Sequence, residues 1–330
     1  MCLTNTHQST SPSIGPPYHG SRLNDTTHLI VHHDKYTEFP FIYVKLYQNL
    51  SLAVVIDTGC GAHNGQTDSP ILELKDFIHR EILGSEQASF NFMVVCTHCH
   101  FDHIGGIEAF SRAGAEIVAS GHDRQFLRPE RREANSLCGA FGMPTPKYEI
   151  RQFAGDGEEL EHKGHSLGLQ IIHTPGHTPD SLAIYDEAER WLFVGDTCYQ
   201  RFATMPWGEE QAVPIILPLQ GNWRDFIASI HTLHEFVQQT EASLDIGSID
   251  RRIRLAAGHT TSQSYAEDFL RRVVAFCEGI VSGAVPEFLQ LPGDVVAPGG
   301  SLGDEMFILW QHEGRTEFSL MAPERFKDDF

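Results

Sequence analysis

The sequence predicts an α/β protein in which two β-sheets pack face to face and helices cover their outer faces. Strand patterns and helical patterns alternate in both halves of the 330-residue chain, and each half opens with strands. Such alternation is typical of layered sheets covered by helices. A composition of 41% hydrophobic and 21% charged residues is that of a globular protein. We find no internal repeat at a solenoid period.

The first half opens with two apolar runs that have the character of buried strands, and Gly59 and Gly61 mark the turn after the second run. The segment 71–83, which follows this turn, carries its apolar side chains on one helical face. We therefore expect strands over 41–47, 52–57, 92–98 and 115–120, and helices over 71–83 and 107–114. Residues 125–165 have no clear period, so we expect a helix followed by an irregular loop there.

The second half repeats this order, with strands first and two amphipathic helices after them. Asn222 is of the type that caps a helix N-terminus. We expect strands over 169–174, 181–186, 191–196 and 252–258, helices over 222–238 and 265–281, and a hairpin over 306–322.

Charge and cysteine content exclude several classes of partner and location. The chain has 24 Lys and Arg against 44 Asp and Glu, a net charge of −20, which repels phosphate backbones and anionic lipid. Nucleic acid and membrane are therefore not expected as partners, and no segment has the ~20 apolar residues of a membrane helix or the pattern of a secretory signal. Seven widely spread cysteines do not form a disulfide framework, so we expect reduced thiols and a cytoplasmic protein.

The strongest chemical signal is the run His98-Cys99-His100-Phe101-Asp102-His103, which follows a predicted strand and precedes Gly105-Gly106. In an extended segment, side chains two residues apart point the same way, so His98 and His100 can bind one ion. Asp102 and His103 follow as the chain turns into a helix and can face a second ion. Imidazole and carboxylate suit zinc, iron or manganese.

Three more candidates lie at or just after the ends of later predicted strands. His177 stands in HTPGHT, Asp196 in FVGDT and His259 in AAGHT. Each would be weak evidence alone, because such residues are common at strand ends. Together they supply a third ligand for each ion and one carboxylate able to bridge both.

The order HxHxDH, PGHT, GDT, GHT over residues 40–275 resembles the metallo-β-lactamase superfamily. The resemblance implies an αββα sandwich of two mixed sheets flanked by helices. It also implies two metal ions, zinc first with iron or manganese as alternatives: one held by His98, His100 and His177, the other by Asp102, His103 and His259, with Asp196 bridging. Asp57 resembles the aspartate behind the ligands that orients an imidazole.

Composition and resemblance together predict a division of the chain. Residues 1–25, rich in Ser, Thr, Pro, Gly and His, are expected to be a flexible leader. Residues 26–285 are expected to be the catalytic domain, and the Gly- and Pro-rich residues 286–330 a C-terminal β extension packed on the same domain. This extension departs from the minimal family pattern and could shape the pocket or mediate a homodimer.

The chemistry implied is hydrolysis. Two dications lower the pKa of a bridging water towards neutrality, so that a hydroxide is available to attack a carbonyl. Asp102 could steer this nucleophile and shuttle its proton. Tyr199, three residues after Asp196, resembles the position in lactonases and some thioesterases where a phenol hydrogen-bonds the substrate carbonyl or leaving group, and it could stabilise an oxyanion.

Within the superfamily, the pattern is most similar to the branch that contains lactonases, glyoxalase-II-like enzymes and acyl-CoA thioesterases. The substrate is therefore expected to be a small molecule. Because the chain is acidic and no phosphate-gripping basic residues can be located, a lactone or lactam comes first and an acyl-CoA or glutathione thioester second. A persulfide dioxygenase with one iron keeps much the same motif and stays open. Flavodiiron-type oxygen reductases carry Glu where this chain has His100, which argues against that class. A protein that serves only as an interaction module is also disfavoured, because it has no need of seven convergent ligands.

Overall fold

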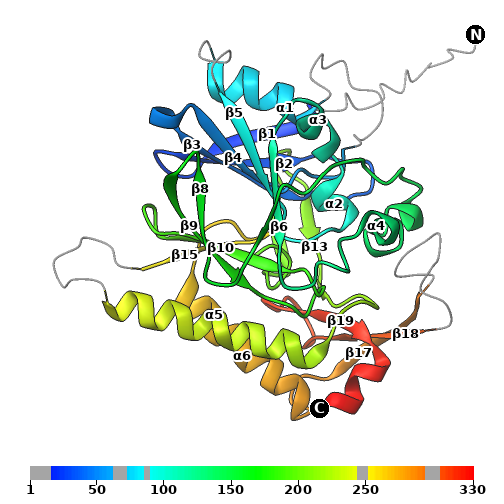
Figure 1. The fold of residues 1–330 in the computed structure, drawn as a ribbon. Coiled ribbons are helices and arrows are strands. Elements are labelled where there is room, and N and C mark those ends of the chain that lie inside the picture. Colours follow the sequence, from blue (N-terminus) through cyan, green and yellow to red (C-terminus); the bar gives the residue numbers. More distant parts are fainter. Residues whose placement is uncertain (1–15, 62–72, 85–89, 244–251, 294–304) are drawn as a thin grey trace, which may run out of the picture.

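The computed structural model describes residues 16–61, 73–84, 90–243, 252–293 and 305–330. Two large sheets lie face to face, with helices on the outer side of each (Figure 1). Both sheets contain parallel and antiparallel neighbours, so the predicted αββα sandwich of two mixed sheets is confirmed. A smaller sheet near the C-terminus shares an apolar cluster with the second sheet.

The first sheet has seven strands in sequence order. Its first four strands are antiparallel neighbours and its last four are parallel neighbours. The strands are β1 (Tyr18–Arg22), β2 (Thr27–His32), β3 (Phe41–Tyr47), β4 (Leu52–Ile56), β5 (Asn91–Val95), β6 (Glu116–Ser120) and β7 (Gln152–Ala154).

The second sheet has six strands, and its only parallel pair is β11 with β15. In spatial order the strands are β16 (Ser264–Tyr265), β15 (Arg254–Ala256), β11 (Trp191–Phe193), β10 (Leu182–Asp186), β9 (His165–His173) and β8 (Glu159–His162). A small hairpin of β12 (Phe202–Thr204) and β13 (Glu210–Ala212) follows β11.

Helices cover the outer faces as the apolar patterns predict. The first sheet carries α1 (Leu74–Phe77), which continues as a π-helix over Ile78–Leu83, together with α2 (Phe101–Ile104), α3 (Ile107–Arg112) and α4 (Pro129–Asn135). The second sheet carries α5 (Trp223–Ser243) and α6 (Ala266–Val281), which lie side by side in Figure 1. Asn222 caps α5, since its Oδ1 accepts a hydrogen bond from the Asp225 N–H at 3.0 Å. In the described part of the chain, no helix has the length and apolarity needed to span a membrane.

The core lies in three layers that match this architecture. One apolar cluster fills the space between the two sheets and includes Val54, Met93, Ile171 and Ile184. A second cluster lies between the first sheet and its helices, and a third lies between the second sheet, α5 and α6. A buried ion pair also joins the sheets, because Lys45 Nζ in β3 lies 2.5 Å from Asp186 Oδ2 in β10.

Residues 286–330 form most of a third, four-stranded sheet. Its order is β14 (Ile215–Ile216), β19 (Leu320–Pro323), β18 (Met306–Trp310) and β17 (Glu287–Pro292), followed by a 3-10 helix over Glu324–Asp329. The predicted hairpin over 306–322 is confirmed by the antiparallel pairing of β18 with β19. Because β14 pairs with β19, the extension is joined directly to the segment that follows β13.

Two expectations were wrong in part. The expected flexible leader, residues 1–25, contains a strand from Tyr18 to Arg22, since β1 pairs with β2, while residues 1–15 lie outside the described part. The expected irregular loop before residue 165 contains β7 and β8. All three strands are short and lie at the edge of a sheet, where exposed polar residues interrupt the alternation of apolar side chains.

Candidate metal centre

The HxHxDH run lies at the carboxyl end of β5, where the chain leaves the first sheet. His98 and His100 precede α2, and His100 is extended with φ −68° and ψ 155°. Asp102 and His103 lie in the only turn of α2, so the change from extended to helical backbone separates the two pairs of side chains. All four side chains are buried.

The other three candidates come from the second sheet. His177 follows β9, Asp196 follows β11, and His259 follows β15. All three are buried at the end of the sandwich where the HxHxDH run lies. The structure therefore brings all seven predicted side chains together, in two groups: His98, His100 and His177, and Asp102, His103, Asp196 and His259.

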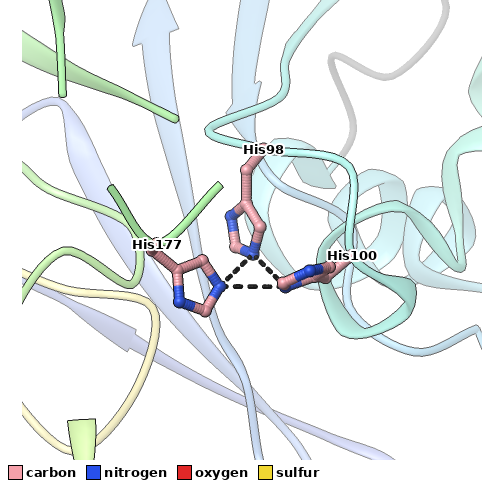
Figure 2. A group of neighbouring side chains, drawn as sticks. All are labelled: His98, His100 and His177. Carbon is pink, nitrogen blue, oxygen red and sulfur yellow. Dashed lines mark hydrogen bonds between the residues drawn. The ribbon is translucent and has the colours of Figure 1, made fainter. Parts of the chain in front are cut away.

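In the first group, three imidazole nitrogens point at one another (Figure 2). His98 Nε2 lies 3.0 Å from His100 Nδ1 and 3.2 Å from His177 Nε2, and the remaining separation, between His177 Nε2 and His100 Nδ1, is 2.9 Å. Zinc–nitrogen bonds of about 2.0–2.1 Å in tetrahedral geometry place two nitrogens about 3.3 Å apart. The triangle is thus slightly smaller than one face of such a site.

The second group alternates imidazole and carboxylate. His103 Nε2 lies 3.4 Å from Asp102 Oδ2 and 3.3 Å from Asp196 Oδ1, and His259 Nε2 lies 3.2 Å from Asp102 Oδ2 and 3.4 Å from Asp196 Oδ2. Asp196 Oδ2 is also 3.9 Å from His177 Nε2 of the first group. Asp196 is therefore the carboxylate that faces both groups, as expected of a bridge.

Hydrogen bonds behind the imidazoles fix which nitrogen faces the site. His177 Nδ1 lies 2.6 Å from the carbonyl oxygen of Ile216, and His259 Nδ1 lies 3.0 Å from that of Glu38. Because a carbonyl only accepts, each Nδ1 carries a proton, and Nε2 is the nitrogen that faces the site.

Asp57 supports one imidazole of each group, in line with the expectation that it orients a ligand. Its Oδ2 lies 2.8 Å from His103 Nδ1 and also accepts a hydrogen bond from Thr97 Oγ1 at 2.7 Å. Since the Thr97 hydroxyl proton goes to Asp57, Thr97 Oγ1 accepts from His98 Nδ1 at 3.1 Å. The left-handed backbone of Asp57, at φ 62°, is a conformation that Asp tolerates better than most residues.

The two groups differ in charge. Burial lowers the pKa of His98 and His177, and burial with His177 nearby lowers the pKa of His100 to about 3, so this group is neutral. In the second group burial also lowers the pKa of His103 and His259, but the nearby carboxylates outweigh it and hold both values well above the ordinary range. The same pairing holds the pKa of Asp102 and Asp196 well below the ordinary range against the effect of burial.

The donor set fits divalent metal ions. In the first group, Nε2 lone pairs of His98 and His177 face each other at 3.2 Å, an arrangement that a cation between them relieves. In the second group, Gly258 leaves room for the ligands: a Cβ there would lie 2.3 Å from Asp196 Oδ1 and 2.7 Å from His103 Cε1. Such ions bind ionised carboxylates and neutral imidazoles, so they would replace the protons that Asp102 and Asp196 hold on His103 and His259.

A cavity of about 100 Å³ opens onto both groups. Its wall includes His100, Asp102, His177, Asp196 and His259. The rest of the wall is mostly apolar, formed by Phe101, Leu137, Phe141, Val213, Ile216, Pro218 and Phe307. No Lys or Arg occurs among the described residues that line it.

Tyr199 also lines this cavity, and its ring centroid is 5.4 Å from that of His259. However, its hydroxyl group donates a hydrogen bond to the carbonyl oxygen of Pro214 at 2.9 Å. The phenol is thus placed near the site as predicted but has a partner in the protein, and its role towards a substrate stays a prediction.

Glu38 is a cavity residue that the sequence reasoning missed. It lies in the loop between β2 and β3, outside every ligand motif, and no spacing rule connects it to the site. Burial and the nearby Asp102 raise the pKa of its carboxyl group to about 8. Asp34, in the same loop, is of a type common in turns, so the sequence could have predicted a turn here. It could not have predicted that the Glu38 side chain faces the cavity.

Comparisons with known proteins agree with this geometry. The family model described as "Metallo-beta-lactamase superfamily" matches residues 46–238, more than half of the chain. An Aspergillus versicolor protein named "Putative transcription factor avaE" is 29% identical over 94% of this chain and 87% of its own length. Bovine acyl-coenzyme A thioesterase MBLAC2 is 28% identical over 44% of this chain, and hydroxyacylglutathione hydrolase of Idiomarina loihiensis is 27% identical over 53%.

This chain spans about half the length of these two enzymes, 54% and 56% respectively. Among solved structures, a metallo-beta-lactamase from Pontibacter korlensis is similar with a TM-score of 0.52 and 17% identity, over 79% of this chain and 99% of that chain. This likeness supports the fold alone. Because the family model covers more than half of its residues, the chain belongs to the metallo-beta-lactamase superfamily, and it is a hydrolase of that superfamily.

Proposed function

We propose that this protein uses two divalent metal ions, zinc in the first place, to hydrolyse a carbonyl-centred bond in a small molecule with an apolar acyl group. The observation that carries the proposal is the position of both ligand groups in the wall of a largely apolar cavity. The seven side chains named above are the proposed ligands, with Asp196 shared. Iron or manganese would suit the same donors.

When bound, the ions supply Lewis-acid polarisation of a carbonyl and lower the pKa of a water towards 7. The chain's own residues do the rest. Asp102 faces the cavity, and its carboxylate, held ionised by His103 and His259, is placed to hold the proton that the attacking water loses. The apolar wall excludes water from around the acyl group and so strengthens the electrostatic interactions of the site.

A thioester is the substrate class we place first. The two enzymes whose names describe hydrolysis, MBLAC2 and hydroxyacylglutathione hydrolase, act by those names on thioesters. With no Lys or Arg among its described lining residues, the cavity suits an apolar acyl group, while an anionic carrier would remain outside.

A lactone or lactam is the second candidate, and the size of the cavity favours it. A volume of about 100 Å³ without a cationic side chain in its described wall suits a compact neutral ring. A lactone presents the same carbonyl to the same groups, but its leaving group stays attached to the acyl part.

For partners and location we propose a small-molecule substrate, no nucleic acid and no membrane, in the cytoplasm. Although one relative is named a putative transcription factor, the net charge of −20 argues against binding of nucleic acid by this chain. Six cysteines in the described part of the chain are free thiols, which suits a reducing compartment. A homodimer through residues 286–330 stays a proposal.

The test combines metal analysis with a substrate panel. Protein purified without chelator is expected to contain about two metal ions per chain, and the zinc-loaded form to hydrolyse thioesters or lactones of neutral acyl groups. His100→Ala and Asp196→Ala are expected to abolish this activity while the protein stays folded by circular dichroism. A metal-free protein, or oxygen uptake with a persulfide as the only activity of an iron-loaded form, would overturn the proposal.

A further inference from the structure

The loop that carries Glu38 is held in an unusual conformation. The buried carboxylate of Asp34 accepts hydrogen bonds from the backbone N–H groups of Tyr36 and Phe39, both at 2.7 Å. Thr37 and Phe39, on either side of Glu38, have left-handed backbones with φ 66° and 50°. Such conformations of residues other than glycine persist only where the surroundings fix them, and they cluster at functional sites.

The main chain of Glu38 ties this loop to the metal centre. Its carbonyl oxygen accepts hydrogen bonds from His259 Nδ1 at 3.0 Å and from Gln211 Nε2 at 2.7 Å. The backbone position of residue 38 is therefore fixed from two sides, independently of its side chain.

The side chain of Glu38 lines the same cavity as Asp102 and Asp196. Apart from the proposed ligands, the only other polar residue of the described wall is Tyr199, and its hydroxyl proton is donated to Pro214. The remaining lining residues are apolar. A polar group on the acyl part of a substrate would therefore meet one acceptor that belongs to the wall, the Glu38 carboxyl group.

We propose that Glu38 is a specificity-determining residue whose carboxyl group accepts a hydrogen bond from a hydroxyl group on the otherwise apolar acyl part of the substrate. The inference rests on the proposed hydrolysis of an acyl carbonyl bond. Next to apolar walls, an acceptor left without a donor costs free energy, so the site selects hydroxyl-bearing acyl groups over acyl groups of equal length that end in methyl.

Two N-acetylcysteamine thioesters of equal acyl length test this: 3-hydroxypropanoyl and butanoyl, which end in hydroxyl and methyl. For the zinc-loaded wild type, kcat/KM for 3-hydroxypropanoyl is expected to exceed that for butanoyl by about tenfold. Glu38→Ala is expected to remove this preference. Glu38→Gln keeps an acceptor oxygen, so it should retain the preference.

Metal content separates this role from a role in metal binding. Because the hydrogen bond of His259 Nδ1 goes to the main-chain carbonyl oxygen of residue 38, which the substitution keeps, Glu38→Ala should bind as much zinc as the wild type. Glu161→Ala, at an exposed position of β8, is the matched control and should keep both the preference and the zinc. An unchanged preference in Glu38→Ala, or loss of zinc in that variant, would overturn the inference. If the zinc-loaded wild type hydrolyses neither thioester and no lactone, the proposed function itself fails.

Discussion

Tyr199 has a hydrogen-bond partner in the protein that bears on its expected role. The sequence pattern places a phenol where it could stabilise an oxyanion, but its hydroxyl group is 2.9 Å from the Pro214 carbonyl oxygen and donates to it. Tyr199→Phe is therefore expected to lower the free energy of unfolding by about 1 kcal/mol, the net value of such a bond, and to change kcat by less than about tenfold. Urea denaturation and steady-state kinetics measure the two effects. A hundredfold loss of kcat at unchanged stability would restore the oxyanion role.

Gly258 shows how little space the second ligand group leaves. A Cβ at this position would lie 2.3 Å from Asp196 Oδ1, far inside van der Waals contact, so Gly258→Ala must displace that carboxylate. We expect the variant to fold but to lose at least one metal ion per chain, as measured by elemental analysis after gel filtration. Gly139→Ala, where an added Cβ meets nothing within 4 Å, should retain both ions. Equal metal content in the two variants would remove Asp196 from the proposed ligand set.

At the scale of elements, the sequence predicted those parts of the fold in which local pattern and tertiary role agree. The strands that precede His98, Asp196 and His259 have strong apolar runs, and the ligand-type residue follows each run directly. The edge strand β1 and the short strands β7 and β8 lack such a run, because few of their side chains face the core.

The cavity wall could not be predicted for a different reason. It depends on contacts between segments far apart in the chain, such as Ile216 in β14 and Phe307 in β18, which meet only because β14 pairs with β19. The same pairing supports the metal centre, since the Ile216 carbonyl oxygen orients His177. Glu38 reaches the cavity through left-handed residues that no periodicity announces.

The ion pair between strands β3 and β10 is the clearest element-scale test of stability. Both side chains are buried, so Lys45→Met would leave the Asp186 carboxylate without its partner between the sheets. We expect a loss of about 3–5 kcal/mol in the free energy of unfolding. The double variant Lys45→Met/Asp186→Leu should recover most of this loss, because no charge then remains buried.

A matched control for this pair is Lys75→Met, which breaks a more exposed pair with Asp76 and should cost less than about 1 kcal/mol. Urea denaturation of the four proteins gives the comparison. A single variant as stable as the control would show that the ion pair contributes nothing to sheet packing.

At the scale of the whole molecule, the proposed metal centre joins the two sheets. Four of its ligand-type side chains follow β5 of the first sheet, and three follow β9, β11 and β15 of the second. Bound ions would therefore link the sheets at one end of the sandwich, and the ligand groups would repel one another or require protons when the ions are removed.

Chelation should accordingly lower the stability of the folded chain as a unit, and not only its activity. Ions that bind the native state alone stabilise it by RT ln(1 + [L]/Kd), about 4 kcal/mol at a free metal concentration a thousandfold above Kd. Calorimetry of protein treated with EDTA should show a lower Tm, and zinc should restore it with an end point near two equivalents. The His100→Ala variant should show a smaller rise, since one group has lost a ligand. A Tm that is independent of zinc in the wild type would show that the seven side chains hold no metal that couples the sheets.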